Sequence, residues 1–567
     1  MEIIRGRNIS FKFDDQVDDL LEGISFSLDG RKKVGLIGDN GSGKTTLLHV
    51  IRGVLPLDRG ELTIRKGTTV AFLPQEVSFG AEARIRDFLW QARGEVCESR
   101  KRLDALDESS PAYADAVNEY YAGGGDAFEA LVEKILAGFG IDRGRLADPI
   151  VSLSGGEKTK IALARILLCD PDVMLLDEPT NHLEIESLAW LEEHLRAGDV
   201  PYIIVSHDRR FLDNCVNEIW ELHNKSLRMY SGNYSFYKIT REREFARQQR
   251  QYETQQKKIE QLQAAARQRR QDADRMEKFK FSRSVTKRGG ICKRDDGSGK
   301  GSVRMTAGMR AARAVERRIQ RMMEKERADK PFAEKDRRIS FSAQPLSGKF
   351  ILRVENLGMR FDSRYVFRNV TFAVRVGVKI GIIGRNGSGK TTLLKIITAN
   401  LSGYDGAYDW SPQVKIGYYS QEHETLDMTH TILQEVLQGN YQDQTRARTI
   451  LGRLNIRGDK VNQAVGTLSL GERSKTALAK ILFSDANILV LDEPTNHIEL
   501  SAREAFEEAL GEYDGAVLIA SHDRYLLDRI TDEIFDIENN RYFAGTYGQY
   551  LSGPADVPPV DDVADVS

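Results

Sequence analysis

Two stretches of this 567-residue chain combine glycines, a lysine and threonines at a spacing that could do phosphate chemistry. They read GDNGSGKTT at 38–46 and GRNGSGKTT at 384–392. The glycines let the backbone wrap a phosphate with its N–H groups pointing inward, the lysine reaches the β- and γ-phosphates, and the next threonine hydroxyl ligates Mg²⁺. Each stretch follows an apolar run and precedes a helical one, as the motif requires. We therefore predict two nucleotide sites, built from Gly38, Asn40, Gly41, Ser42, Gly43, Lys44, Thr45 and Thr46, and from Gly384, Asn386, Gly387, Ser388, Gly389, Lys390, Thr391 and Thr392.

A third GSGK lies at 297–300, within GICKRDDGSGKGSV. Here Arg294 stands where the leading glycine belongs, Gly301 replaces the Ser or Thr after the lysine, and no apolar strand precedes the segment. We therefore interpret it as a glycine-bearing cationic loop and not as a nucleotide site.

Acidic residues and histidines recur at matching places after apolar strands. The runs VMLLD and ILVLD end in Asp177 and Asp492, which are placed to hold the Mg²⁺ shell. A glutamate follows each aspartate, Glu178 and Glu493, and can orient or deprotonate the attacking water. The histidines of the two SHD motifs, His207 and His522, follow further apolar strands and are predicted to contact the γ-phosphate. A single histidine is more often structural, but recurrence at one offset favours function.

The chain is a duplication of an α/β unit. Lys44 and Lys390 are 346 positions apart, whereas the paired aspartates and the paired histidines are both 315 apart. The first copy therefore carries 31 additional residues, which we place at about 94–124 as a short helical pair closed by glycines. In both copies β-branched runs alternate with helical stretches, which predicts a mainly parallel sheet covered by helices.

A different segment separates the copies. Residues 238–280 are rich in Gln, Arg and Glu, with Phe245, Tyr252, Ile259 and Ala266 at intervals of seven, and 303–326 carry a second apolar stripe. This pattern predicts a two-helix antiparallel coiled coil. We assign domains at 1–237, 238–345 with a tip loop at about 284–303, and 346–552, followed by an acidic tail at 553–567 expected to be disordered.

Charge is distributed unevenly along the chain. Residues 241–340 contain 30 Lys+Arg against 15 Asp+Glu, although the whole chain has a net charge of −2. Such a basic segment indicates a polyanionic partner, and Phe279 and Phe281 near the tip can stack on bases. No apolar run reaches the roughly 20 residues of a membrane span, no secretory signal opens the chain, and the four cysteines lack metal-ligand spacing. We expect a cytoplasmic protein without a membrane partner.

These motifs, with LSGGEK at 153–158 and LSLGER at 468–473, resemble the ATP-binding cassette superfamily. The resemblance implies an ATPase whose two cassettes pair head to tail within one monomer, around two ATP molecules with Mg²⁺. One site would join Lys44, Gln75, Asp177, Glu178 and His207 to Ser469 and Gly471, and the other would join Lys390, Gln421, Asp492, Glu493 and His522 to Ser154 and Gly156. The metal would be faced in the first site by Thr45, Gln75 and Asp177, and in the second by Thr391, Gln421 and Asp492. Two aromatic residues, Phe13 and Phe361, would either stack on adenine or pack in the core.

One position departs from the family pattern. Leu470 stands where the first signature has Gly155, so it adds a side chain and loses the freedom of glycine at positive φ. We expect the two sites to turn over differently.

The hairpin between two cassettes, together with LDEPTNHLE and LDEPTNHIE, is similar to the F subfamily of ATP-binding cassette proteins. Members act on ribosomes: the ATP-bound form occupies the tRNA exit site, and the hairpin reaches the P-site tRNA and the peptidyl-transferase centre. A long tip loop and a short insertion fit the antibiotic-resistance branch, which protects ribosomes. Two alternatives remain: a general translation factor, and the paired ATPase of a membrane transporter.

Overall fold

The computed structural model describes residues 2–14, 18–75, 77, 79–80, 83–107, 110–181, 183–286, 314–315, 317, 320, 349–362, 364–420, 426–496 and 498–553. The chain divides into two compact units, Met1–Tyr237 with Arg337–Ser567, and Lys238–Asp336. The first unit contains both copies of the duplicated sequence, and the second contains the segment between them.

A six-stranded sheet forms the centre of the first copy, in the order β5-β6-β7-β3-β8-β9. Every neighbouring pair is parallel except β8 and β9. β6 and β7 are buried along their whole length, as expected for strands covered on both faces. The strands are β3 (Lys33–Ile37), β5 (Val70–Leu73), β6 (Val173–Asp177), β7 (Tyr202–Val205), β8 (Glu218–His223) and β9 (Ser226–Ser231).

A second, three-stranded antiparallel sheet lies in each copy and was not predicted. In the first copy it consists of β1 (Glu2–Phe11), β2 (Leu21–Asp29) and β4 (Arg59–Ile64), with β1 in the middle. Helix α1 (Lys44–Arg52) shares one apolar core with both sheets, through residues such as Leu47 and Ile51. The helix that follows the first phosphate-binding stretch is therefore packed between two sheets.

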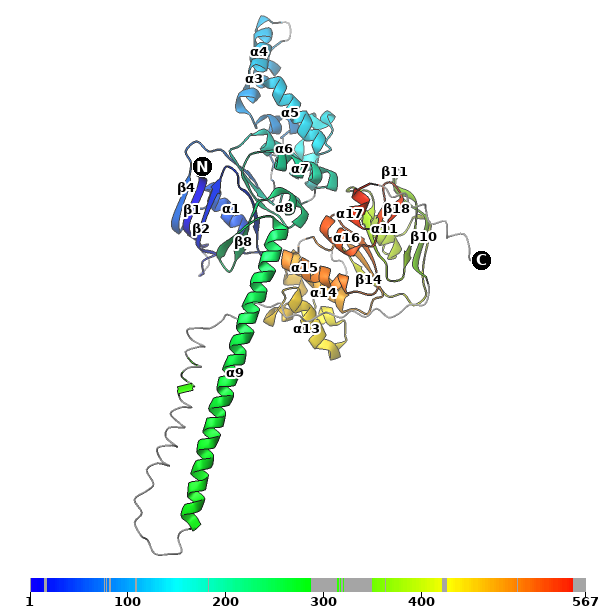
Figure 1. Ribbon diagram of the computed structural model, residues 1–567. Helices are drawn as coiled ribbons and strands as arrows, with labels where there is room; N and C mark the ends of the chain where they lie inside the picture. Colours follow the sequence, from blue (N-terminus) through cyan, green and yellow to red (C-terminus); the bar gives the residue numbers. More distant parts are fainter. Residues whose placement is uncertain are drawn as a thin grey trace. The chain divides into compact units, whose positions relative to one another are not determined.

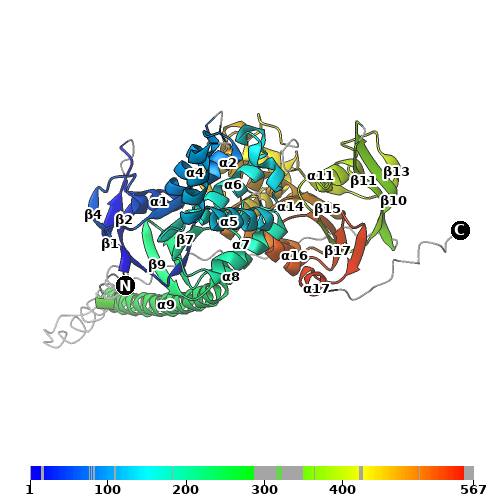
Figure 2. The same cartoon turned by 90° about the horizontal axis from the view of Figure 1, so that it is seen from above.

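The remaining helices of the first copy pack into a separate core with the other face of the parallel sheet. Helices α3 and α4 contact each other within the stretch where 31 residues are additional, and α5 contacts both α6 and α7 (Figures 1 and 2). The helices are α2 (Ile85–Trp90), α3 (Gly94–Asp104), α4 (Pro111–Ala122), α5 (Gly125–Gly138), α6 (Gly155–Leu168), α7 (Ile185–Ala197) and α8 (Arg209–Cys215).

The second copy repeats this architecture, which confirms the predicted α/β fold of two duplicated units. Its sheets have the orders β14-β15-β16-β12-β17-β18 and β11-β10-β13. The strands are β10 (Phe350–Phe361), β11 (Arg364–Arg375), β12 (Lys379–Ile383), β13 (Asp405–Trp410), β14 (Ile416–Tyr419), β15 (Ile488–Asp492), β16 (Ala516–Ala520), β17 (Glu533–Asp536) and β18 (Arg541–Ala544). The helices are α11 (Lys390–Ile397), α12 (Ile432–Leu437), α13 (Gln444–Arg453), α14 (Leu470–Phe483), α15 (Leu500–Gly511), α16 (Arg524–Ile530) and α17 (Tyr547–Leu551).

A single helix, α9 (Tyr234–Thr286), runs for 53 residues through the stretch predicted at 238–280 (Figure 1). It begins four residues earlier than that stretch because Asn233 caps it: the Asn233 Oδ1 atom accepts a hydrogen bond from the Phe236 N–H at 3.1 Å. Of the predicted heptad residues, Ile259 and Ala266 are buried. The return limb predicted at 303–326 lies outside the described residues apart from 314–315, 317 and 320.

Within the described part of the chain, no helix has the length and apolar composition needed to cross a membrane.

The close packing of α5 on α7 gives a test of the fold. A Cβ atom built on Gly138 would lie 2.1 Å from the Trp190 ring. We expect Gly138→Ala to destabilise the protein by about 1–3 kcal/mol, because the indole must move within a packed core. Gly452→Ala is the matched control, since nothing lies within 4 Å of a Cβ atom at that helical position. Thermal unfolding should show a lower midpoint for the first variant alone; equal midpoints would contradict this packing.

Candidate functional site

The two phosphate-binding stretches form tight turns between a central strand and a helix. Gly41 and Gly43 have φ of 76° and 101°, and Gly387 and Gly389 have φ of 79° and 97°. Only glycine adopts such angles without strain. Gly38 also tolerates no side chain, because a Cβ atom there would lie 2.4 Å from the Leu222 carbonyl oxygen. The glycines of these turns are thus required by the backbone conformation and by the close approach of Gly38 to Leu222.

Both turns fit a phosphate. The ammonium of Lys44 donates to the Gly38 and Asp39 carbonyl oxygens at 2.8 and 3.0 Å, and Lys390 repeats these bonds with Gly384 and Arg385. Each lysine lies folded over its own turn and is buried. The Oγ atoms of Ser42 and Ser388 are buried without a hydrogen-bond partner among the described residues. A buried hydroxyl without a partner, beside a lysine ammonium, matches a ligand rich in oxygen.

The threonine and the aspartate of each site lie together. The Thr45 Oγ1 atom donates to the Asp177 Oδ2 atom at 2.7 Å, and Thr391 reaches Asp492 Oδ1 at 3.2 Å. This follows from the strand order, because β3, β7 and β6 are consecutive neighbours in a parallel sheet and their carboxyl ends share one edge. No group of three or more His, Cys, Asp or Glu side chains with metal-binding geometry occurs among the described residues. A metal ion here would need oxygens from the nucleotide.

The next residue of each strand end is a buried glutamate in strained backbone geometry. Glu178 and Glu493 have φ of 50° and 48°, which is uncommon for a residue with a side chain. Burial raises the pKa of Glu178 to about 7, against the lowering effect of the Lys44 and Arg503 charges. Burial likewise raises the pKa of Glu493 to about 8, opposed by Lys390. A carboxyl group with a pKa near neutrality can accept a proton from water.

The histidines lie beside these glutamates. His207 Nε2 is 3.2 Å from Glu178 Oε1, and His522 Nε2 is 3.5 Å from Glu493 Oε1. Burial lowers the pKa of His522 to about 3 and holds that of His207 well below its usual value, and in both cases nearby cations act in the same direction. Both imidazoles are therefore neutral in this state. Each copy thus brings together the lysine, threonine, aspartate, glutamate and histidine that we predicted from sequence.

The signature serines cap the helices that follow them. Ser154 and Ser469 are the N-caps of α6 and α14, and both form reciprocal capping boxes, with Glu157 and Glu472. Our backbone argument about Leu470 was wrong, because Gly155 does not have a positive φ and a Cβ atom there would meet nothing within 4 Å. Leu470 fits the same helical position and is 49% exposed, so it differs from Gly155 only by its side chain.

The structure says less about the predicted glutamine and phenylalanine residues of the two sites. Gln75 is exposed after β5, and Gln421 lies outside the described residues. Phe13 and Phe361 are 38% and 51% exposed, and the Phe13 ring packs edge-on against Phe11 with centroids 5.0 Å apart. Exposure leaves both rings accessible to a base, so their role in adenine stacking stays a prediction.

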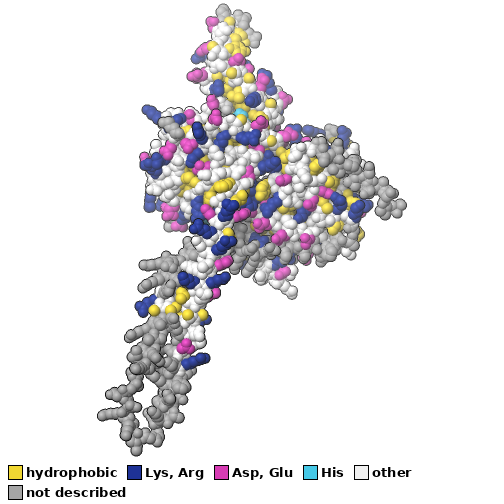
Figure 3. Space-filling view, in the orientation of Figure 1, with side chains coloured by type: hydrophobic (Ala, Val, Ile, Leu, Met, Phe, Trp, Pro, Cys, Tyr) yellow, Lys and Arg dark blue, Asp and Glu magenta, His cyan; other side chains and the backbone are white. Residues whose placement is uncertain are grey.

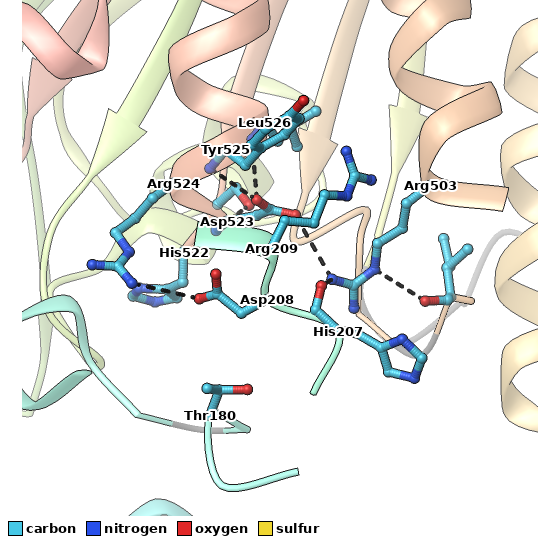
Figure 4. Close-up of polar contacts among 12 residues, drawn as sticks. Thr180, His207, Asp208, Arg209, Arg503, His522, Asp523, Arg524, Tyr525 and Leu526 are labelled. Carbon is cyan, nitrogen blue, oxygen red and sulfur yellow. Dashed lines mark hydrogen bonds and ion pairs between the residues drawn. The ribbon is translucent and has the colours of Figure 1, made fainter. Parts of the chain in front are cut away.

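Sequence reasoning missed a set of ion pairs between the two copies. Arg209 Nη1 donates to Glu507 Oε2 at 2.7 Å, and both side chains are buried. The duplicate pair, Arg524 with Glu192, makes the reciprocal contact, and Arg524 also lies 3.7 Å from Asp208 (Figure 4). The detectable signal was an arginine directly after SHD in both copies.

The copies also meet beside the phosphate-binding turns. The Ser501 hydroxyl of α15 lies 3.5 Å from Asp39 Oδ1 of the first copy. The charge of Glu499 acts on Lys44, and that of the duplicate residue, Glu184, acts on Lys390. Each lysine is therefore influenced by the segment that follows the buried glutamate, Glu178 or Glu493, of the other copy.

Comparisons with known proteins agree with this geometry. A family model described as ABC transporter matches residues 21–181 and 367–496, and a second model with the same description matches 220–288. ABC transporter F family member 5 of Arabidopsis thaliana is 31% identical over 94% of this chain and 75% of its own length. Ribosome protection protein VmlR of Bacillus subtilis (strain 168) is 31% identical over 95% of this chain and 87% of its own length.

Solved structures share the fold. The RNase-L inhibitor matches with a TM-score of 0.58 and 17% identity over 94% of this chain and 87% of its own. An archaeal ribosome recycling factor, solved in complex with a ribosomal stalk protein, matches with a TM-score of 0.57 and 17% identity over 93% of this chain and 87% of its own. At this identity the likeness shows the arrangement of two such units in one chain and nothing about partners.

The ion pairs between the copies can be tested by a double-mutant cycle. Arg524→Leu leaves Glu192 and Asp208 buried without their cation, so we expect a loss of about 3–5 kcal/mol in the free energy of unfolding. Arg524→Leu combined with Glu192→Leu should cost less than the sum of the single changes. Urea unfolding provides the measurement. Arg102→Leu, which breaks the exposed pair with Glu119, is the control and should cost at most about 1 kcal/mol. Additive losses would exclude coupling between the two side chains.

Proposed function

Since the chain belongs to the F family of ABC proteins and is an ATPase, we propose that it acts on the ribosome and protects it from antibiotics. In its ATP-bound state it occupies the tRNA exit site. The segment between the copies then extends toward the P-site tRNA and the peptidyl-transferase centre. The observation that carries this proposal is the combination of two ATP sites with a long basic helix between them.

The described part of α9 supports a nucleic-acid partner. Dark blue Lys and Arg side chains follow one another along it in Figure 3. Its exposed basic side chains outnumber the exposed acidic ones, with Glu242, Glu253, Glu260 and Asp272 against Arg243, Arg247, Arg250, Lys257, Lys258, Arg267 and Arg275. Cations spaced along one helix neutralise phosphates and release counterions, which makes binding strong and dependent on salt. A solvated helix needs only balanced charge.

Similarity to a ribosome protection protein supports the narrower claim. VmlR matches almost the whole chain, including the segment between the copies. The predicted tip loop at 284–303 lies almost wholly outside the described residues, so its length comes from the sequence. A loop of this length, rich in glycine and cations, suits a crowded RNA cavity better than a helix end does.

Closure on ATP would use the residues already described. Lys44 and Lys390 are free to exchange their contacts with carbonyl oxygens of the turn for phosphate oxygens. Thr45 with Asp177, and Thr391 with Asp492, are the residues that would hold Mg²⁺, which neutralises phosphate charge when bound. Glu178 and Glu493 orient the water and take its proton, while Ser154 and Ser469 contact the nucleotide held by the other copy.

Trapping the closed state tests ribosome binding. In the double variant Glu178→Gln, Glu493→Gln, the proton acceptor is lost at both sites while ATP binding is retained, so hydrolysis should fall by roughly two orders of magnitude or more. We expect this variant to co-sediment with ribosomes in ATP and to remain free in ADP. The wild-type protein in ATP is the comparison. A trapped variant that pellets with membranes instead would favour a transporter ATPase.

Shortening the loop at 284–303 tests the drug role separately. We expect its removal to abolish any increase in antibiotic tolerance conferred by the chain and to leave ATP hydrolysis within about two-fold of the wild-type rate, because no nucleotide residue lies there. Removal of residues 554–567 is the matched control and should leave tolerance unchanged. If tolerance survives the loop deletion while ribosome binding is intact, the loop does not carry the drug role. A general translation factor is indicated instead if loss of the chain slows growth or translation without drug present.

A further inference from the structure

One arginine crosses from the second copy to the catalytic residues of the first. Arg503 lies in the first turn of α15, and its Nη1 atom donates to the backbone carbonyl oxygen of His207 at 3.2 Å (Figure 4). His207 is the residue whose imidazole lies 3.2 Å from Glu178. The contact therefore links the second copy to the histidine of the first ATP site.

The guanidinium of Arg503 is held firmly in this position. Its Nε atom donates to the Ile498 carbonyl oxygen at 3.0 Å, and Nη1 is 3.8 Å from Asp523 Oδ2. Both of these partners belong to the second copy, and the Arg503 side chain is only 12% exposed. An arginine fixed by its own copy presents its remaining N–H groups in a defined direction. The position of the Arg503 guanidinium relative to His207 is thus set by the second copy.

The first copy has no equivalent group. The offset of 315 residues between the copies places Leu188 at the position of Arg503. The backbones match, because the Leu188 N–H donates to the Glu184 carbonyl oxygen and the Arg503 N–H to the Glu499 carbonyl oxygen, both at 2.9 Å. Leu188 is 4% exposed and belongs to the apolar core of its own copy. A leucine has no polar side-chain atom that could bond the His522 carbonyl.

The charges around Glu178 and Glu493 also differ between the two sites. The Arg503 charge acts on both Glu178 and His207. The principal groups acting on Glu493 are Lys390, His522, Asp492 and Asp523, all from the second copy. The charge of Arg503, from the other copy, therefore acts on the first site, whereas the leading charges at Glu493 come from its own copy.

We propose that Arg503 is a positioning residue for the first ATP site, supplied by the second copy, and that the second site works without a counterpart. By fixing the His207 backbone, Arg503 keeps the imidazole 3.2 Å from the Glu178 carboxylate. The two sites are built unequally, and hydrolysis at the first depends on the contact between the copies. This inference rests on ATP hydrolysis alone and is independent of the ribosomal proposal.

The test measures each site separately. Glu493→Gln leaves hydrolysis to the first site, and Glu178→Gln leaves it to the second. Phosphate formed in the first turnover is recorded against ATP concentration, so that reopening of the copies does not limit the signal. Arg503→Leu, which installs the residue found at 188, is added to each background.

We expect Arg503→Leu to lower the first-turnover rate constant of the first site by roughly ten-fold or more, because positioning errors of this kind act on the chemical step. Half-saturation by ATP should change by less than about two-fold, and the second site should keep its rate within about two-fold. Arg503→Lys retains the charge and one donor, so it should recover part of the lost rate.

Two controls separate positioning from packing. Glu508→Leu changes an exposed residue of the same helix and should leave both sites unchanged. An unchanged second site in the Arg503→Leu protein shows that the copies still pair. Equal losses at both sites, a loss confined to ATP affinity, or no loss at the first site would each overturn the proposal.

Discussion

The pair of buried ion pairs between the copies is the contact on which the rest of this structure depends. Two ion pairs, Arg209 with Glu507 and Arg524 with Glu192, join the residue after each SHD motif to a helix of the other copy, α15 or α7. Buried charges are costly without a partner, so each copy needs the other at this point. The N-cap residues of these two helices, Glu184 and Glu499, are the ones whose charges act on the lysine of the opposite phosphate-binding turn. Pairing of the copies and assembly of the ATP sites therefore depend on the same segments of the chain.

Both sites hold buried polar groups in unfavourable conditions. Ser42 and Ser388 hydroxyls are buried without partners, and two glutamates at the ends of β6 and β15 combine positive φ with burial. Such features reduce stability, and they persist where the surrounding fold enforces them. Strands covered on both faces fix the glutamates, and the glycine turns fix the serines. The phosphate oxygens of a nucleotide would accept hydrogen bonds from the two serine hydroxyls.

Much of this could be predicted from the sequence. The repeated glycine, aspartate and histidine motifs follow apolar strands, and parallel topology brings their ends to one edge, so Lys44, Asp177 and His207 had to meet. The antiparallel sheets β2-β1-β4 and β11-β10-β13 gave a weaker signal because their strands vary in burial and carry irregular registers. The contact from Arg503 to His207 could not be predicted from the sequence, because it joins residues almost three hundred positions apart. Its acceptor is a backbone oxygen, which every residue possesses. The positive φ expected at Gly155 was wrong because this glycine is the first residue of α6, where the backbone is helical and a Cβ atom would meet nothing within 4 Å.

Fusion of the two copies into one chain has a consequence for how the protein can change. In a symmetric pair of identical chains, any substitution enters both active centres at once, and a harmful effect at either is inherited by both. Here position 188 is a leucine and position 503 an arginine, so one centre has an arginine contact at a position where the other copy has a buried leucine. A single substitution can therefore change one ATP site while the residues of the other stay the same, so the two hydrolysis rates can be altered separately.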